Sequence, residues 1–138
     1  MNIKPLTLLT TLVIAACSST PANQTNSLGV LNSTWQLVEL TGQKISVDAP
    51  PYLVFNDEGK VSGFAGCNRM FGGAEIGQGM QIRFSNLATT MMACPQLTLE
   101  GQFMQMLEKV DNYSLSGDSL SLNKARMAPL ARFKRLKE

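Results

Sequence analysis

The amino-acid sequence predicts a mainly β fold of the α+β type, in which a small antiparallel sheet rolls into a β-barrel and one helix packs on it or caps it. Short runs rich in β-branched and aromatic residues are separated by turns that contain Gly, Asn or Asp, as in strands joined by hairpins. One later segment spaces its apolar residues as a single helix face does. A closed barrel hides the edges of short strands most completely, so we expect the sheet to close on itself.

Seven segments match the strand pattern. The loop "NDEG" at 56–59 lies between two of them and offers a positive φ or an Asx turn, and Gly117 with Asp118 marks a second hairpin. Pro129 cannot donate to a strand ladder, so the last segment should begin at a sheet edge or a bulge and then close the sheet. The expected strands are 34–40 (TWQLVEL), 52–55 (YLVF), 60–66 (KVSGFAG), 80–84 (MQIRF), 113–117 (YSLSG), 119–123 (SLSLN) and 127–136 (MAPLARFKRL).

The segment "TLEGQFMQMLEKV" at 98–110 breaks the strand pattern and is expected to be the helix. Thr98 is a candidate N-cap, and Gly101 in the first turn costs about 1 kcal/mol relative to Ala. The apolar residues that recur at helical spacing are Leu99, Phe103, Met106, Leu107 and Val110.

Composition narrows the functional classes. The 138 residues are 44% apolar and 16% charged, which fits one ordinary globular domain. The formal net charge of +2 is far from the basic field that nucleic-acid binding needs, so we expect no nucleic-acid partner. The chain has no His, which removes His-dependent triads and zinc sites with a His ligand. Asp57 and Glu58 lie in a turn and are expected to be solvated, so we expect no enzyme, no metal and no cofactor.

The amino terminus has the layout of an export signal. Lys4 precedes the short apolar stretch 6–16, which is too short to span a bilayer, and "IAAC" follows at 14–17. This stretch resembles the lipobox of bacterial lipoproteins, which implies cleavage after residue 16 and lipidation of Cys17. Ser18 stands where an inner-membrane retention signal has Asp, so the resemblance implies the periplasmic face of the outer membrane, with the membrane as a partner through the lipid.

Three regions follow from this reading. Residues 1–16 are the lipoprotein signal peptide, and residues 17–33 comprise the lipidated Cys and a small, polar, flexible tether. Residues 34–138 are the folded domain.

With Cys17 committed to lipid, Cys67 and Cys94 remain as an even pair in an oxidising compartment, which favours a disulfide. Two free buried thiols are the main alternative. A metal site or a redox pair lacks support, because neither a His nor a C-x-x-C motif accompanies the two cysteines.

Three motifs resemble the META domain of the HslJ family: "WQL" at 35–37, "SGFAGCNRMFGG" at 62–73 and "LATTMMACP" at 87–95. The resemblance runs from about residue 31 to residue 133. It implies a small lipocalin-like barrel, often exported and lipid-anchored, with family roles in heat shock and novobiocin tolerance and with no established ligand or enzymatic activity. The chain departs from the family at Met91, where Arg often precedes Met-Ala-Cys.

Several polar and sulfur-containing residues are candidates for function. Asn68 and Arg69 are candidate interaction residues, because Asn tolerates a left-handed corner and Arg projects from it. The alternative, which we favour, is that both residues only shape this corner. Met104 and Met106, like Met91 and Met92, are read as fillers of gaps in the core rather than as a copper site. The basic tail is read as protection of an edge strand, with contact to anionic lipid as the alternative; its residues are Arg132, Lys134, Arg135 and Lys137.

Two functional hypotheses remain. The first is a non-catalytic envelope lipoprotein that supports envelope integrity or stress tolerance by binding an unidentified envelope protein. The second is a barrel that binds a small apolar molecule or a lipid. An interior filled by large side chains favours the first hypothesis, and an interior lined by small ones favours the second.

Overall fold

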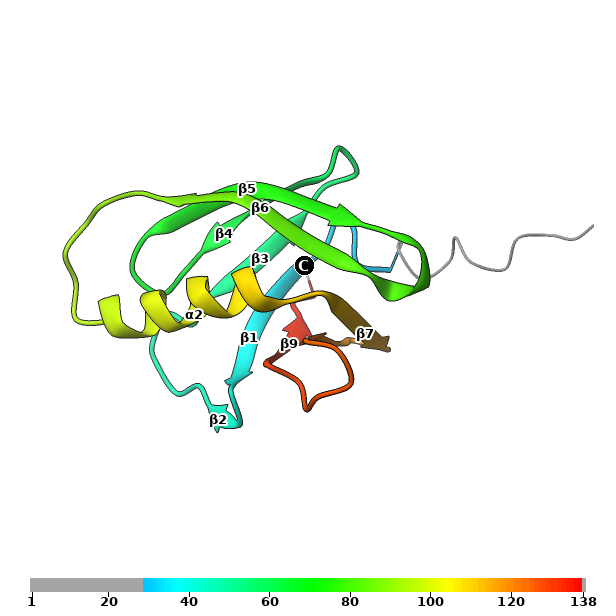
Figure 1. Ribbon diagram of the computed structural model, residues 1–138. Coiled ribbons are helices and arrows are strands. Elements are labelled where there is room, and N and C mark those ends of the chain that lie inside the picture. The colour runs from blue at the N-terminus through cyan, green and yellow to red at the C-terminus, as the bar shows by residue number, and fades with distance from the viewer. Residues whose placement is uncertain (1–28, 138) are drawn as a thin grey trace, which may run out of the picture.

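One antiparallel sheet of nine strands forms most of the regular structure in residues 29–137, the part of the chain that the computed structural model describes (Figure 1). A 13-residue α-helix and a short 3-10 turn complete it. The elements are β1 Thr34–Leu40, β2 Gln43–Lys44, β3 Tyr52–Phe55, β4 Lys60–Phe64, β5 Arg69–Ile76, η1 Gln78–Met80, β6 Ile82–Thr89, α2 Leu97–Lys109, β7 Asn112–Ser116, β8 Ser119–Asn123 and β9 Ala131–Arg135.

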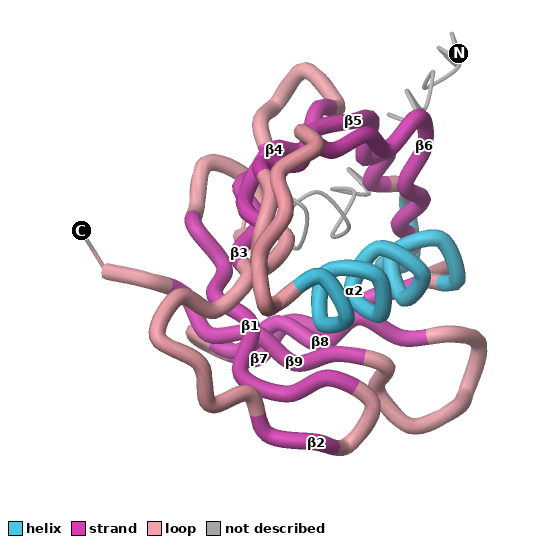
Figure 2. The backbone as a smooth tube through the Cα atoms, turned by 90° about the vertical axis from the view of Figure 1, so that its left-hand side faces the viewer, coloured by secondary structure: helices cyan, strands magenta, loops and turns pink. Residues whose placement is uncertain are grey.

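The sheet curls until its two end strands approach each other. Its order is β6-β5-β4-β3-β1-β9-β8-β7, with β2 paired to the end of β1. The ends meet at a bridge between Gln81 and Asn112, and the Ile82 N–H donates to the Asp111 carbonyl at 3.2 Å. Figure 2 shows α2 lying between the β6 end of the sheet and the strands of the other end. This arrangement confirms the predicted curled, barrel-like β fold with one packed helix.

Large side chains fill the interior of the curl. Trp35 and Phe133 are fully buried, and the Phe133 ring lies 6.2 Å from that of Phe103 on α2. The side chains alternate along the strands, so that one face of each strand except the exposed β2 points into this core. The largest fully buried side chains are Trp35, Phe55, Phe103, Phe133, Leu37, Leu53, Met70, Ile82, Leu107, Leu120, Leu122 and Val30.

Both predicted hairpins are confirmed. The Asn56 side-chain Oδ1 accepts the N–H of Glu58 at 3.1 Å and that of Lys60 at 2.8 Å, which makes the expected Asx turn. Gly59 has φ +74° in the same loop. Gly117, with φ +57°, turns the chain between β7 and β8.

Three sequence predictions about local structure were wrong. Residues 69–76 form a full strand, β5, which is absent from the predicted strands. Strand β9 lies between β1 and β8 in the interior of the sheet, and Pro129 precedes it, so this segment is neither an edge nor the closing strand. Helix α2 begins at Leu97, and the residue at its N-cap is Gln96 rather than Thr98.

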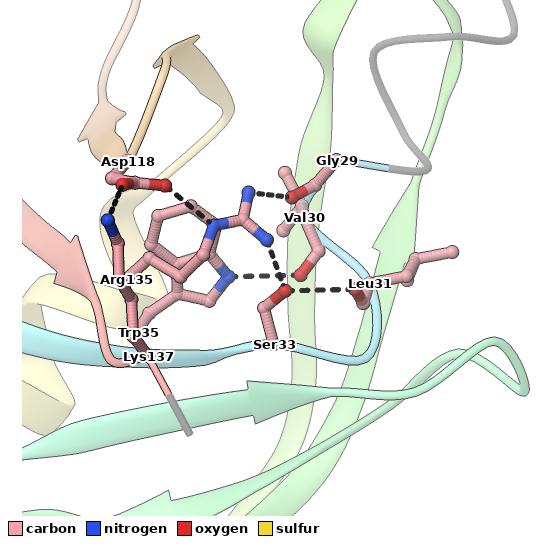
Figure 3. A network of polar contacts seen from close by, with 8 residues as sticks. All are labelled: Gly29, Val30, Leu31, Ser33, Trp35, Asp118, Arg135 and Lys137. Atoms are coloured by element: carbon pink, nitrogen blue, oxygen red, sulfur yellow. Dashed lines mark hydrogen bonds and ion pairs between the residues drawn. The ribbon is translucent and has the colours of Figure 1, made fainter.

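The folded part begins earlier than the predicted boundary at residue 34. Val30 is fully buried, and its carbonyl accepts the Trp35 Nε1–H at 3.0 Å. The Arg135 guanidinium lies over the Trp35 ring, 4.6 Å from its centroid, and donates to the carbonyl of Gly29 at 2.7 Å and to the Ser33 hydroxyl (Figure 3). Residues 29–33 therefore belong to the packed domain and not to the tether. Residues 1–16 and Cys17 lie outside the described part.

The carboxylate of Asp111 also fixes the place where the two ends of the sheet, near β6 and β7, meet. The Asp111 Oδ1 accepts the N–H of Ala125 at 2.7 Å and the side-chain amide of Asn112 at 2.6 Å. The Ala125 N–H, followed by the Asn112 amide and the charge of Lys124, lowers the pKa of Asp111 below its ordinary value. This carboxylate holds the loop after β8 against the start of β7.

Two glycines in regular structure should respond oppositely to Ala. A Cβ at Gly63 in β4 would overlap the backbone carbonyl of Tyr52, so Gly63→Ala should lower the free energy of unfolding by about 3 kcal/mol or more. A Cβ at Gly101 in α2 meets nothing within 4 Å, so Gly101→Ala should raise the free energy of unfolding by about 0.5–1 kcal/mol. Chemical denaturation measures both, and equal effects at the two positions would contradict this packing.

Candidate functional site

The stretch of glycine, cysteine and asparagine after β4 makes a tight corner at residues 65–68. The Ala65 N–H donates to the Asn68 carbonyl at 2.8 Å, and Gly66, with φ +114°, is buried at the turn. Cys67 is joined to Cys94 by a disulfide, with 6.0 Å between the two Cα atoms. The corner is thus tied to the segment between β6 and α2, as the cysteine pairing predicts.

Asn68 lies inside this corner and not on the surface. Its side chain is 3% exposed, and the positive φ of the turn belongs to Gly66. Asn68 therefore shapes the corner, as the structural reading of this residue predicts, whereas the left-handed backbone belongs to Gly66 and the buried side chain does not face a partner. Its amide instead connects three separate parts of the chain.

Glu100 on α2 makes the first of the two sets of bonds that link Asn68 to other segments. The carboxylate is 8% exposed; its Oε2 accepts the Asn68 backbone N–H at 2.6 Å, and its Oε1 accepts the Asn68 Nδ2–H at 3.0 Å. Glu100 lies in the first turn of α2, where the helix dipole favours a negative charge. Sequence reasoning missed this residue, although its spacing of three and seven residues from Phe103 and Leu107 places it on the buried face of the helix.

The loop at residues 90–96, named here the disulfide loop, is the second connection. The Asn68 Oδ1 accepts the Met92 backbone N–H at 2.7 Å and the Thr90 hydroxyl at 3.0 Å. The Asn68 Nδ2 donates to the Met92 carbonyl at 3.2 Å. Both backbone polar groups of Met92 are therefore held by one buried side chain, close to the Cys94 end of the disulfide.

The two methionine side chains of the same loop point outward. Met91 is 98% exposed and Met92 is 67% exposed; we call these two residues the methionine tip. The prediction that they fill gaps in the core was wrong for this pair, whereas Met106 on α2 is buried, as predicted. The tip combines an anchored backbone with two solvated thioethers.

Arg69 is the predicted candidate that does lie on the surface. Its backbone N–H donates to the Thr90 hydroxyl at 3.2 Å, while its side chain is exposed. In the register of the sheet, Tyr52, Phe64 and Arg69 stand side by side across β3, β4 and β5. The rings of Tyr52 and Phe64 stack at 6.3 Å, and Phe71, two residues after Arg69, is 53% exposed. We call these four residues the outer-face patch.

The basic tail does not protect an edge strand, because β9 is internal. Arg132 pairs with Glu39 at 3.4 Å, and Arg135 pairs with Asp118 at 3.3 Å. Lys137 also reaches Asp118, at 3.7 Å. Three of the four predicted tail cations thus make ion pairs within the domain.

Residues 29–137 show surface hollows but no cluster of metal-binding side chains. No group of three or more His, Cys, Asp or Glu side chains there could hold a metal ion. Two hollows open on the surface: one of about 170 Å³ beside α2, and one of about 600 Å³ on the outer face of β4, β5 and β6. No helix in the described part is both long and apolar enough to cross a membrane.

The comparisons with known proteins agree with this fold. A family model described as META domain matches residues 27–137, so the chain belongs to the META domain family. One structure solved by NMR is 25% identical, with a TM-score of 0.62 over 78% of this chain and 92% of that one. A second NMR structure, of a protein from Burkholderia xenovorans, is 23% identical, with a TM-score of 0.66 over 95% of this chain and 100% of that one. None of the curated proteins matches the chain.

Removing the Asn68 amide should loosen the whole corner. Asn68→Ala keeps the backbone N–H that binds Glu100 Oε2 but removes the side-chain partner of Glu100 Oε1 and of the Met92 N–H and carbonyl, so we expect a loss of about 2–4 kcal/mol in the free energy of unfolding. Glu100→Gln places the NH₂ group of Gln against one of the two Asn68 N–H donors. We expect this variant to lose about 2 kcal/mol in the free energy of unfolding. The matched control is Glu108→Gln on the exposed side of α2, which should stay within about 0.5 kcal/mol of the parent. Equal losses for the two Glu variants would contradict the network.

The disulfide should stabilise the domain through the 27-residue separation that it closes. The chain-entropy model gives about 3.5 kcal/mol for a loop of that length. We expect the Cys67→Ser/Cys94→Ser double variant to lose about that amount under oxidising conditions, and the parent to lose a similar amount when a reductant is added. A double variant that unfolds at the same denaturant concentration as the oxidised parent would show that the bond contributes nothing.

Proposed function

We propose that the protein is a non-catalytic, lipid-anchored protein of the bacterial envelope that supports envelope integrity under stress by binding another protein. Membership of the META domain family supports an envelope-type protein. The observation that carries the interaction hypothesis is the packing of the interior. Trp35, Phe55 and Phe133, among other large side chains, are buried in the interior, where a ligand-binding barrel leaves space.

The surface offers the kinds of side chain that protein interfaces use. Met, aromatic residues and Arg are enriched at the centres of such interfaces. The methionine tip presents two flexible thioethers that adapt to different partner shapes. The outer-face patch adds Arg69 and Phe71, which lie two residues apart on β5 and so on one face of it. The Arg69 backbone N–H donates to Thr90, where the disulfide loop begins. Binding of a small apolar molecule inside the barrel remains the alternative, and the filled interior counts against it.

The position of Gly29, where the chain enters the domain, supports one orientation of the domain relative to the membrane. Gly29, 12 positions after Cys17 in the sequence, is held by Arg135. In Figure 1 the first described residues, in blue, lie on the right, and the segment between β6 and α2 lies at the left end. A domain anchored to the periplasmic face of the outer membrane through Cys17 therefore presents the methionine tip away from the lipid.

Lipid attachment is tested by metabolic labelling with an alkyne fatty acid. The parent and a Cys94→Ser variant should both be labelled and fractionate with the outer membrane, because Cys17 alone accepts the lipid. A Cys17→Ser variant should lose the label. Equal labelling of the Cys17→Ser variant would contradict the anchor.

Protein interaction is tested by placing a photoreactive amino acid at position 91 and irradiating cells during heat stress. A defined protein adduct should form at position 91 and be absent when the probe is at the exposed helix position 108. Only lipid adducts, or a small molecule retained in the purified domain, would overturn the interaction hypothesis. A deletion strain should also become more sensitive to heat and to novobiocin, with rescue by the parent gene and not by Cys17→Ser.

A further inference from the structure

The methionines of residues 29–137 differ widely in exposure, and Met80, at 40%, and the half-buried Met104 lie between the extremes. Met70 and Met106 are 1% and 3% exposed and lie in the core. Met91, Met92 and Met127 are 98%, 67% and 66% exposed. A thioether in water meets dissolved oxidants freely, whereas a thioether in a packed core meets them only when the protein opens.

The methionine tip differs from an ordinary flexible loop because its backbone is anchored. The bonds to Asn68 use the N–H and the carbonyl of Met92, and neither sulfur takes part in them. The disulfide fixes the loop again at Cys94. Chemistry at the two sulfurs therefore leaves every hydrogen bond of the buried network in place.

From these observations we propose that the methionine tip is a site of reversible oxidation by peroxides and hypohalous acids. The sulfur of Met91 or Met92 takes one oxygen atom, giving a sulfoxide; a hydroperoxide is thereby reduced to an alcohol or water, and hypochlorous acid to chloride with release of a proton. In the reverse step a dithiol reductase returns the thioether, and its dithiol becomes a disulfide with release of water. The sulfur is oxidised by two electrons in the first step and reduced by two in the second.

The consequence of oxidation is a change of surface and not of fold. A sulfoxide is polar and accepts hydrogen bonds, so two neighbouring sulfoxides turn the most exposed apolar part of the domain into a polar one. The domain stays folded, because the buried methionines and the Asn68 network are untouched. The chemistry of this site is independent of whether the tip binds a partner.

The test treats the full-length protein, purified in detergent, with increasing hydrogen peroxide or hypochlorous acid and maps each sulfoxide by peptide mass spectrometry. Met91 should be oxidised first, followed by Met92 and Met127, and at least about tenfold faster than Met70 and Met106. Methionine sulfoxide reductases should restore the parent mass, and the thermal midpoint of the oxidised protein should match that of the parent.

A Met91→Leu/Met92→Leu variant removes the site, and Met127→Leu is the matched control. The double variant should take up two fewer oxygen atoms at low oxidant while its melting stays unchanged, and the control should still be oxidised at Met91. Oxidation of Met127 before Met91, oxidation of Met70 together with Met91, or melting that falls as Met91 is oxidised would each overturn the proposal.

Discussion

The side chain of Asn68 and the carboxylate of Glu100 hold together three segments that are far apart in the sequence. Asn68 belongs to the corner between β4 and β5, Glu100 to the first turn of α2, and Met92, bonded to the same amide, to the disulfide loop. A buried carboxylate or amide without partners costs more than its hydrogen bonds contribute, so these groups accept only the arrangement that satisfies all of them. Every buried side-chain nitrogen and oxygen within residues 29–137 has a partner. The placement of the helix against the corner depends on this network.

Different kinds of interaction fix the two ends of the domain. At the end where the chain enters, Arg135 lies over the buried Trp35 ring and binds Gly29, Ser33 and Asp118, so one cation joins the first described residues to the β7–β8 hairpin (Figure 3). At the other end, a disulfide and an uncharged amide hold a loop whose side chains face water. Between them, large apolar side chains fill the curl of the sheet. The proposed role in protein interaction rests on these buried side chains.

Much of the fold could be predicted because local signals agreed with it. The Asx turn at Asn56, the glycine turn at Gly117 and the helical spacing through Phe103 all have sequence signatures that the structure realises. Strand β5 was missed because Gly72 and Gly73 suggest a loop, although here they allow β6 to approach: a Cβ at Gly72 would lie 2.9 Å from the Ser85 carbonyl oxygen. The place of β9 in the middle of the sheet is a matter of topology, which no local pattern encodes.

The site was harder to predict than the fold for the same reason. Asn68 was singled out by its residue type, but its burial depends on Glu100, which lies 32 residues later. Met91 and Met92 read as core residues from hydrophobicity alone, and only the anchored loop shows that they face water. The pairing of Cys67 with Cys94 was predicted correctly, because the lipobox resemblance assigns Cys17 to lipid and leaves these two as a pair.

Hydrogen exchange at the backbone amide of Met92 tests this account most directly. Met92 carries a solvated side chain, yet its N–H donates at 2.7 Å to the buried Asn68 amide oxygen. We expect that N–H to exchange slowly, with an opening free energy close to that of global unfolding, and to lose this protection in Asn68→Ala while the core strands stay protected. Exchange at the rate of an unstructured loop in the parent protein would contradict the claim that a single buried amide anchors the disulfide loop.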